Sequence, residues 1–261
     1  MRGQKRTDLA SLFTLRGKTA IVTGGSIGVG EQICHGLAEA GANVVVCARN
    51  VARCEELAHT LEDRYKVSAL AVRCDVSDER DVESVVAEAV GKYRGIDVLV
   101  NNAGITWGAE YHEMSLKHWQ KVLDTNLNGT FLFCKHAGKQ MIPRQSGKVI
   151  NISSILGMYG HRTLTAPSYT ASKAAINGFT LDLAVKWARY NITVNAIAPG
   201  WYPSNMTGSV MKKMNDALLA PIPLGRYLRD SDIKGVVVFL AAPASDFITG
   251  QVIVVDGGEM L

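Results

Sequence analysis

The amino-acid sequence predicts a single-domain α/β protein, in which a doubly wound, mostly parallel sheet of seven strands carries helices on both faces. Short apolar runs alternate with longer amphipathic runs along the chain, and this alternation is typical of such sheets. A glycine-rich stretch joins the first apolar run to the first amphipathic run. No repeat, linker or change of composition marks a second domain. We therefore expect one domain over residues 17–261, preceded by an N-terminal extension over residues 1–16.

Composition and charge narrow the class of protein. The chain has 261 residues, 47% apolar and 20% charged, so it can bury a large core without disulfides or metals. Its net charge is +4 and the basic residues are scattered, which argues against a nucleic-acid or membrane partner. The five cysteines form no C-x-x-C motif, which indicates a reducing compartment. No apolar run reaches the roughly 18 residues of a membrane span, and no signal core is visible, so we expect a cytoplasmic protein.

The first apolar run, residues 19–23, leads through a glycine-rich turn into a helical pattern over residues 31–40. The spacing Gly24-x-x-x-Gly28-x-Gly30 differs from the G-x-G-x-x-G of other dinucleotide folds. Glycines allow the backbone to approach a pyrophosphate, and the free N–H groups of the following helix attract its charge. The stretch is therefore either a phosphate cradle or an ordinary glycine loop.

The second strand, residues 43–48, ends next to Arg49. In a strand–helix–strand unit, the end of the second strand lies beside the adenosine ribose of a bound dinucleotide. An acidic residue there would bind a free 2′-hydroxyl, whereas an arginine suits a 2′-phosphate. The sequence therefore favours NADP(H) over NAD(H). The alternative is a solvent-facing arginine at the start of a loop.

Further along the chain, polar residues follow the ends of predicted strands. Asp75 and Val76 follow the third strand, and Asn102 lies just beyond the fourth. Ligands of open α/β sheets bind at these carboxyl ends. The short polar side chains either cap backbone groups or contact adenine. In this part of the chain we predict helices at residues 51–64 and 77–93 and strands at residues 67–74 and 96–100.

A long helical pattern over residues 115–141 is interrupted near Asn126. Asparagine is a poor helix former that competes for backbone hydrogen bonds. Asn126 therefore marks either a local kink or a residue of the site. The fifth strand, residues 148–153, leads directly into Ser154.

Tyr169 and Lys173 lie four residues apart in a predicted helix over residues 168–188. Side chains at positions i and i+4 share a helix face. A cation within about 4–6 Å favours the ionised form of a phenol, whose free pKa is near 10. Such a pair can act as an acid and base, but a tyrosine and a lysine at this spacing are also common on solvated helix faces.

The last part of the chain contains the least regular large stretch, residues 201–224, which is rich in methionine and aromatic residues and bounded by prolines. It is either a mobile lid over a substrate pocket or a short helix that packs on the core. Pro199 and Gly200 precede it, after a strand. The remaining predicted elements are strands at residues 192–197 and 252–255 and a helix at residues 230–242.

Taken together, these motifs resemble those of the short-chain dehydrogenase/reductase family, over about residues 16–261. They are TGGSIGVG (23–30), NNAG (101–104), Asn126, ISS (152–154), the Y-x-x-x-K pair (169–173) and PG (199–200), in the order and spacing of the family. The resemblance implies a Rossmann fold that binds a nicotinamide dinucleotide and oxidises or reduces a small alcohol or carbonyl compound.

The resemblance also implies roles for the catalytic residues. Tyr169 would exchange a proton with the substrate oxygen, and Lys173 would lower the tyrosine pKa and hold the nicotinamide ribose. Ser154, rather than Ser153, would bind the substrate carbonyl. Asn126 would hold a water that links Lys173 to solvent. The implied cofactor contacts are Gly24, Ser26, Ile27, Gly28, Gly30, Arg49, Asp75, Val76, Asn102, Tyr169, Lys173, Pro199, Gly200 and Ser204.

Three departures from the family pattern bear on specificity. Ile27 stands where many NADP(H)-binding members have a basic residue, so the cofactor preference rests on Arg49. Ser204 stands where threonine is common, and it keeps the hydroxyl that can reach the nicotinamide carboxamide. The segment between Ser154 and Tyr169 is a residue or two longer than usual.

Within the family, the sequence is similar to NADPH-dependent 3-oxoacyl (β-ketoacyl) reductases, including the rhamnolipid-associated branch. We therefore expect reduction of a ketone to a secondary alcohol. The opening of the domain also resembles gluconate and polyol dehydrogenases, so oxidation of a sugar acid or polyol is the alternative function. A third hypothesis is a non-catalytic scaffold that binds a dinucleotide. The family further implies a homodimer or homotetramer formed by the helices near residues 115–142 and 167–189.

Overall fold

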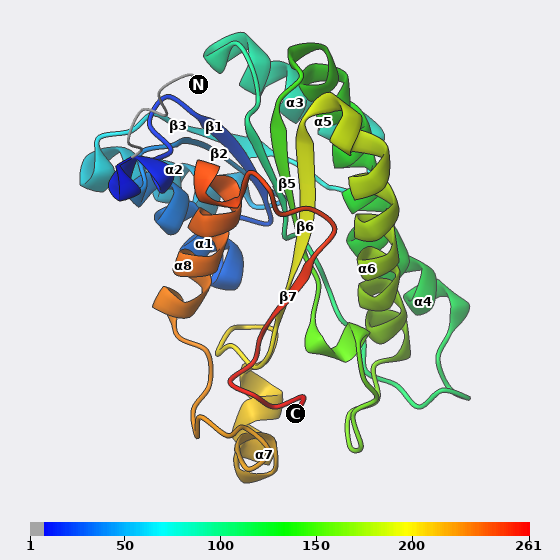
Figure 1. Cartoon of the computed structure of the whole chain (residues 1–261). Helices are drawn as coiled ribbons and strands as arrows, with labels where there is room; N and C mark the ends of the chain where they lie inside the picture. The colour runs from blue at the N-terminus through cyan, green and yellow to red at the C-terminus, as the bar shows by residue number, and fades with distance from the viewer. Residues whose placement is uncertain (1–7) are drawn as a thin grey trace.

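All seven strands of the computed structural model run parallel in one sheet, with the order β3-β2-β1-β4-β5-β6-β7 (Figure 1). The structure describes residues 8–261. The strands are β1 (Thr19–Thr23), β2 (Asn43–Ala48), β3 (Ala69–Arg73), β4 (Val98–Asn101), β5 (Gly147–Ile152), β6 (Ile192–Pro199) and β7 (Val252–Val255). The predicted doubly wound parallel sheet is therefore confirmed.

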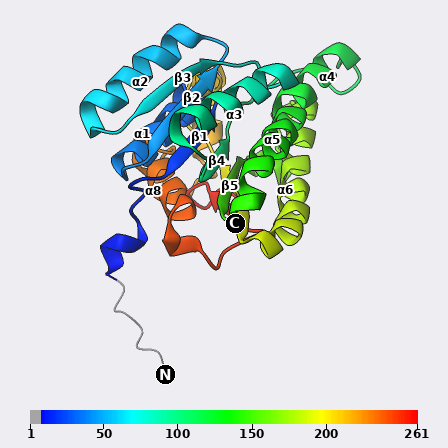
Figure 2. The ribbon, with the colours of Figure 1, turned by 90° about the horizontal axis from the view of Figure 1, so that it is seen from above.

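Helices form a layer on each face of the sheet, as the view along the layers shows (Figure 2). One layer contains α1 (Gly28–Glu39), α2 (Val51–Tyr65) and α8 (Asp230–Ala241), and the other contains α3 (Glu79–Tyr93), α5 (Gly129–Arg144) and α6 (Pro167–Trp187).

Alternate residues of each strand supply the two halves of the core. Ala20 and Val22 of β1 pack with the layer of α1, α2 and α8, whereas Ile21 packs with the opposite layer. All five residues of β1 are consequently buried. This explains why the strands appear in the sequence as continuous apolar runs.

The order of the strands positions the site. β1 lies between β2 and β4, so the chain leaves the carboxyl ends of β1 and β4 on different sides of the sheet. At such a switch point the connections diverge and leave a crevice that binds ligands in open α/β sheets.

The helix predicted over residues 115–141 is divided in the structure. It consists of α4 (Leu116–Leu123), a π-helical turn (Asp124–Asn128) and α5. The turn widens around Asn126, whose side chain bonds to backbone outside the helix. Single π-helical turns are frequent at functional sites.

The segment over residues 201–224 contains a short helix, α7 (Gly208–Leu219). Met211 and Leu218 of this helix are buried against Trp201 and Ile222, in a small apolar cluster separate from the two main ones. The structure therefore shows the packed helix that was one of the two alternatives. The mobility of this segment as a lid stays a prediction.

At the other end, the described chain starts with a 3₁₀-helix (Leu9–Leu12), and Leu15 is the first buried residue. The Leu15 N–H donates to the carbonyl of Ala40 at 2.8 Å, which joins this part of the chain to the domain. Residues 1–7 of the predicted extension lie outside the described residues. Between residues 8 and 261, no helix combines the length and the apolar character needed to cross a membrane.

Candidate active site

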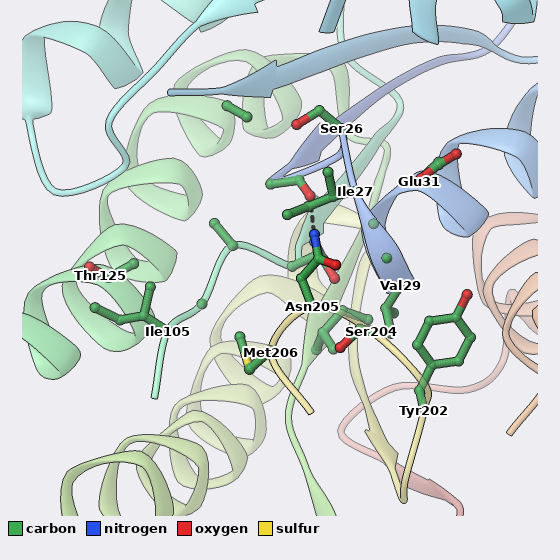
Figure 3. Close-up of a pocket in the computed structure, with 18 of the residues that line it drawn as sticks. Ser26, Ile27, Val29, Glu31, Ile105, Thr125, Tyr202, Ser204, Asn205 and Met206 are labelled. Carbon is green, nitrogen blue, oxygen red and sulfur yellow. Dashed lines mark hydrogen bonds between the residues drawn. The ribbon is translucent and has the colours of Figure 1, made fainter. Parts of the chain in front are cut away.

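A cavity of about 600 Å³ opens at the carboxyl ends of the strands. Every residue predicted to bind the cofactor or to act in catalysis lines this cavity, except Asn126. Figure 3 shows Ser26 and Ile27 of the glycine-rich loop on one side, with Ser204 and Met206 of the segment after β6 facing them. The structure thus brings together residues that are far apart in the sequence.

The glycine-rich loop is packed too tightly for side chains at its key positions. A Cβ at Gly30 would collide with the carbonyl oxygen of Gly24, and a Cβ at Gly24 would lie 2.9 Å from the Cα of Ala103. Gly24 and Gly28 also have φ angles of +60°, which only glycine adopts without strain. The first residues of α1 line the cavity, so this end of the site fits a pyrophosphate.

Asn102 holds the glycine-rich loop in place. Its side-chain nitrogen donates to the carbonyls of Thr23 and Gly24 at 2.9 and 3.1 Å, and its backbone N–H donates to the Thr23 hydroxyl at 2.9 Å. The amide nitrogen of Asn102 therefore binds backbone. Of the two alternatives for this side chain, the structure shows the backbone cap.

Two arginines lie at the end of the cavity formed by β2 and α2. Arg49 and Arg53 are both exposed and line the cavity. Within residues 8–261, neither guanidinium forms a salt bridge. Asp75 lines the same end; burial opposes its ionisation, but hydrogen bonds from Ser77 and the nearby Arg49 and Arg73 outweigh burial and lower its carboxyl pKa.

At the opposite end, Tyr169 and Lys173 lie one turn apart on α6 and face the cavity. The Ser154 side chain lies next to the Tyr169 hydroxyl and acts to lower its pKa. The Nζ atom of Lys173 lies 5.5 Å from the centre of the tyrosine ring and donates to the carbonyl of Ile152 at 2.6 Å. The Ser153 hydroxyl instead donates to the carbonyl of Lys173 at 3.1 Å. Ser154 is thus the serine that reaches the phenol.

Burial dominates the titration of this pair. It raises the pKa of the Tyr169 phenol, and the neighbouring Ser154 side chain only partly opposes this rise. Burial also lowers the pKa of the Lys173 ammonium to about 8. The lowering of the tyrosine pKa by Lys173, which the family resemblance implied, is therefore not seen in this structure. The phenol is protonated at neutral pH, which is the form that can donate a proton.

Asn126 is fully buried and supports the site from behind. Its Oδ1 accepts from the N–H of Ile105 at 2.8 Å, and its Nδ2 donates to the carbonyl of Ile105 and the hydroxyl of Ser172, both at 3.0 Å. Ser172 in turn donates to the carbonyl of Tyr169 at 2.7 Å. Asn126 is therefore both the kink in the helix and a support that joins the loop after β4 to the tyrosine helix.

The loop after β6 closes the cavity. Gly200 lies so close to the chain after β7 that a Cβ there would be 3.0 Å from the Cα of Asp256. Ser204 is directly opposite the glycine-rich loop, because a Cβ at Gly28 would lie 3.5 Å from the Cβ of Ser204. The hydroxyl of Tyr202 donates to Asp230 at 2.7 Å and anchors this loop to α8.

Sequence reasoning missed several residues of the site. Arg53 lies in the first turn of α2, four residues after Arg49, and this short spacing could have identified it as a second cation. Ser172 belongs to the Y-x-x-x-K segment, but nothing in the pattern shows that it meets Asn126. Ile105 lies in an irregular loop whose conformation has no periodic signal, whereas Met206 belongs to the 201–224 segment, already a candidate lid over the substrate pocket.

Comparisons with known proteins agree with this geometry. The family model described as Enoyl-(Acyl carrier protein) reductase matches residues 24–259. The 3-oxoacyl-[acyl-carrier-protein] reductase FabG of Staphylococcus aureus (strain Mu50 / ATCC 700699) is 40% identical over 244 residues, which are 92% of this chain and 97% of the relative. The 2-dehydro-3-deoxy-D-gluconate 5-dehydrogenase of Bacillus subtilis (strain 168) is 38% identical over 252 residues, which are 96% of this chain and 97% of the relative.

Solved structures are similar over almost the whole chain. A short-chain type dehydrogenase/reductase from Mycobacterium marinum has a TM-score of 0.93 at 33% identity, covering 97% of this chain and 99% of that chain. The RhlG/NADP complex of Pseudomonas aeruginosa has a TM-score of 0.90 at 36% identity, covering 96% of this chain and 99% of that chain. These likenesses, together with the cavity and its residues, show that the chain belongs to the short-chain dehydrogenase/reductase family of oxidoreductases.

Proposed function

We propose that this oxidoreductase uses NADP(H) to reduce a ketone of the 3-oxoacyl type to a secondary alcohol. The observation that carries the proposal is that Ser154, Tyr169 and Lys173 line the same cavity as the glycine-rich loop. Hydride delivery to a ketone leaves negative charge on its oxygen, which requires a hydrogen-bond donor and a proton. The two hydroxyls can supply both.

Bound NADPH would supply the hydride, while the protein orients the ketone and controls the proton. The Ser154 hydroxyl would donate to the carbonyl oxygen, and Tyr169 would transfer its proton to that oxygen as the alcohol forms. Because burial raises the tyrosine pKa, the phenol is protonated at neutral pH. The protonated phenol is the form that ketone reduction requires.

Lys173 would hold the nicotinamide ribose and restore the tyrosine proton. With a pKa of about 8, its ammonium group can release and regain a proton near neutral pH. Gly104 lies beside both groups, because a Cβ there would be 3.6 Å from Nζ of Lys173 and 3.4 Å from Oδ1 of Asn126. A water bound near Gly104 would link the lysine to the asparagine and relay the proton.

The preference for NADP(H) is supported by the cations at the adenosine end. Arg49 and Arg53 are both available for a 2′-phosphate, and the Ser26 hydroxyl lies on the same side of the cavity. Arginines recognise phosphate oxygens through their fork of N–H donors. The RhlG structure of P. aeruginosa also contains NADP.

The substrate class is supported by the apolar side chains near the catalytic pair. Ile105 and Met206 line the cavity from two different loops (Figure 3), where they offer apolar surface beside the polar side chains of Thr125 and Asn205. A 3-oxoacyl chain suits such walls better than a polyol, which needs many polar partners. The B. subtilis relative, named for a sugar-acid substrate, favours a sugar-acid dehydrogenase as the second candidate.

The test is a substrate panel with both cofactors, followed by the absorbance of the reduced nicotinamide. We expect rapid NADPH consumption with a 3-oxoacyl thioester and much slower oxidation of gluconate. Faster turnover of gluconate would favour the second candidate. If no ketone or alcohol in the panel is turned over, the protein is a non-catalytic dinucleotide-binding scaffold.

We also propose that the protein forms a homodimer or homotetramer through α5 and α6. Phe131 of α5 and Leu181 and Val185 of α6 expose 50%, 52% and 76% of their surface, which is unusual for large apolar side chains on two neighbouring helices. Light scattering coupled to gel filtration measures the oligomeric state, and replacement of Leu181 by glutamate should lower it.

A further inference from the structure

The last residues of the chain return to the substrate end of the cavity, where Figure 1 shows the C-terminus beside α7. There, one oxygen of Glu259 accepts two hydrogen bonds from distant segments. The hydroxyl of Tyr159 donates to its Oε1 at 2.8 Å, and the indole N–H of Trp201 donates to the same atom at 3.1 Å. A single carboxylate therefore joins three segments of the chain.

The first of these segments carries Ser154. A 3₁₀-turn (Ile155–Gly157) begins at Ser154, whose hydroxyl caps it by accepting from the N–H of Leu156 at 3.2 Å. This turn is seated on α6, because a Cβ at Gly157 would lie 2.6 Å from the carbonyl carbon of Lys173. Tyr159 comes two residues after the turn, so its position constrains the loop that continues from the substrate-binding serine.

The second segment is the one that covers the cavity. Trp201 is only 9% exposed and directly follows Gly200, and Ser204 comes three residues later. The ring of His161, two residues after Tyr159 in the first segment, contacts the second, with its centroid 6.2 Å from that of Tyr159 and 6.1 Å from that of Trp201. The two loops that border the substrate end thus meet at one aromatic contact, which Glu259 joins from the side of the C-terminus.

The C-terminal tail itself is held firmly. The carboxylate of Asp256 accepts from the N–H groups of Gly258 and Met260 at 2.8 and 3.0 Å, which folds residues 256–260 into a turn. The carbonyl of Gly257 accepts from the N–H of Leu224 at 3.1 Å. The tail therefore contacts both ends of the 201–224 segment, at Trp201 and at Leu224.

We propose that Glu259 is a positioning residue, whose carboxylate fixes the loop after Ser154 and the segment after Gly200 at a set separation around the ketone. The consequence for catalysis rests on the proposed reductase function. Glu259 does not line the cavity, and neither do its hydrogen-bond partners Tyr159 and Trp201, so its effect should fall on the binding of the ketone rather than on that of NADPH.

Glu259→Ala tests the proposal. Loss of both hydrogen bonds should raise the KM for the ketone by about tenfold or more while the Kd for NADPH, measured by fluorescence, stays within about twofold of wild type. It should also speed tryptic cleavage after Arg162 and after Lys212 and Lys213, which are exposed in the two joined segments. The thermal unfolding curve verifies that the variant is folded.

Glu259→Gln is the matched conservative variant. Its Oε1 can accept the same two hydrogen bonds, and in the described chain Oε2 has no hydrogen-bond partner that the new amide group would disturb. We therefore expect this variant to restore both the KM and the wild-type rate of cleavage. Glu83→Ala, at an exposed position on α3, is the control for loss of a carboxylate.

A wild-type cleavage rate in Glu259→Ala would overturn the proposal, as would a glutamine variant that is impaired as strongly as the alanine variant. The cleavage assay needs no substrate, so it decides the positioning role even if the wild-type protein reduces no ketone. In that case the proposed function fails and faster cleavage still supports the role of Glu259.

Discussion

The two ends of the cavity are built in different ways. At the cofactor end, backbone atoms pack directly against each other: Gly30 meets the carbonyl of Gly24, and Asn102 binds the backbone of the same loop. At the substrate end, side chains join irregular loops, chiefly through Tyr159, Trp201 and Glu259. The substrate loops can therefore change while the cofactor end keeps its geometry, which explains how one fold serves relatives named for different substrates.

The largest effect should come from a change at the cofactor end, where backbone atoms pack against each other. Gly30→Ala places a Cβ against the carbonyl of Gly24 and 2.5 Å from the Nδ2 of Asn102, so the loop must open. We expect the affinity for NADPH, measured by titration calorimetry, to fall by about a hundredfold or more, because the N–H groups that would hold the pyrophosphate are displaced.

Gly91→Ala provides the control for this change. Gly91 lies in α3, and the position that its Cβ would take has no neighbouring atom within 4 Å, so the substitution should leave NADPH affinity unchanged and stabilise the helix by roughly 0.5–1 kcal/mol. If Gly30→Ala bound NADPH as tightly as this control, tight backbone packing at Gly30 would not be what shapes the cofactor end.

An intermediate effect should follow from a change in charge at the cofactor end. Arg49→Asp removes a partner of the 2′-phosphate and adds a like charge, so the preference for NADPH over NADH should fall by about 10- to 100-fold. The ratio of kcat/KM values for the two cofactors measures it. Arg80→Asp, at an exposed site on α3 away from the cavity, should leave the ratio unchanged. An unchanged ratio in Arg49→Asp would contradict the proposed cofactor preference.

The smallest expected effect is a dependence on pH at the catalytic pair. Burial lowers the pKa of Lys173 to about 8, so its positive charge is complete below that pH and lost above it. Burial raises the pKa of Tyr169, so the phenol stays protonated through the same range. The kcat for ketone reduction at saturating NADPH should therefore fall several-fold as the pH rises through about 8. A flat profile up to pH 10 would show that the charge of Lys173 is not needed.

The sheet and the cofactor end could be predicted because their signals are local. Strands such as residues 19–23 are apolar throughout, since both faces of the sheet are covered, and the glycines of the loop occupy positions where a side chain has no room. Each of these features depends on neighbours in the sequence or on the regular repeat of strand and helix.

The substrate end could not be predicted because its contacts are long-range. Tyr159 and Glu259 are 100 residues apart and neither belongs to a motif. Asn126 stood out as a polar residue in an apolar helix, but its bonds to Ile105 and Ser172 require the folded chain. The raised pKa of Tyr169 likewise follows from burial, which the spacing of tyrosine and lysine does not reveal.

The central claim is that the hydroxyl of Tyr169 gives its proton to the substrate oxygen. The most direct measurement compares Tyr169→Phe with wild type in single-turnover oxidation of NADPH by the best ketone of the panel, with Tyr190→Phe as the control. We expect the rate to fall by about 10³-fold while the Kd for NADPH stays within about twofold, because the phenyl ring keeps the packing and loses only the proton donor. A phenylalanine variant that keeps the wild-type rate would contradict the claim.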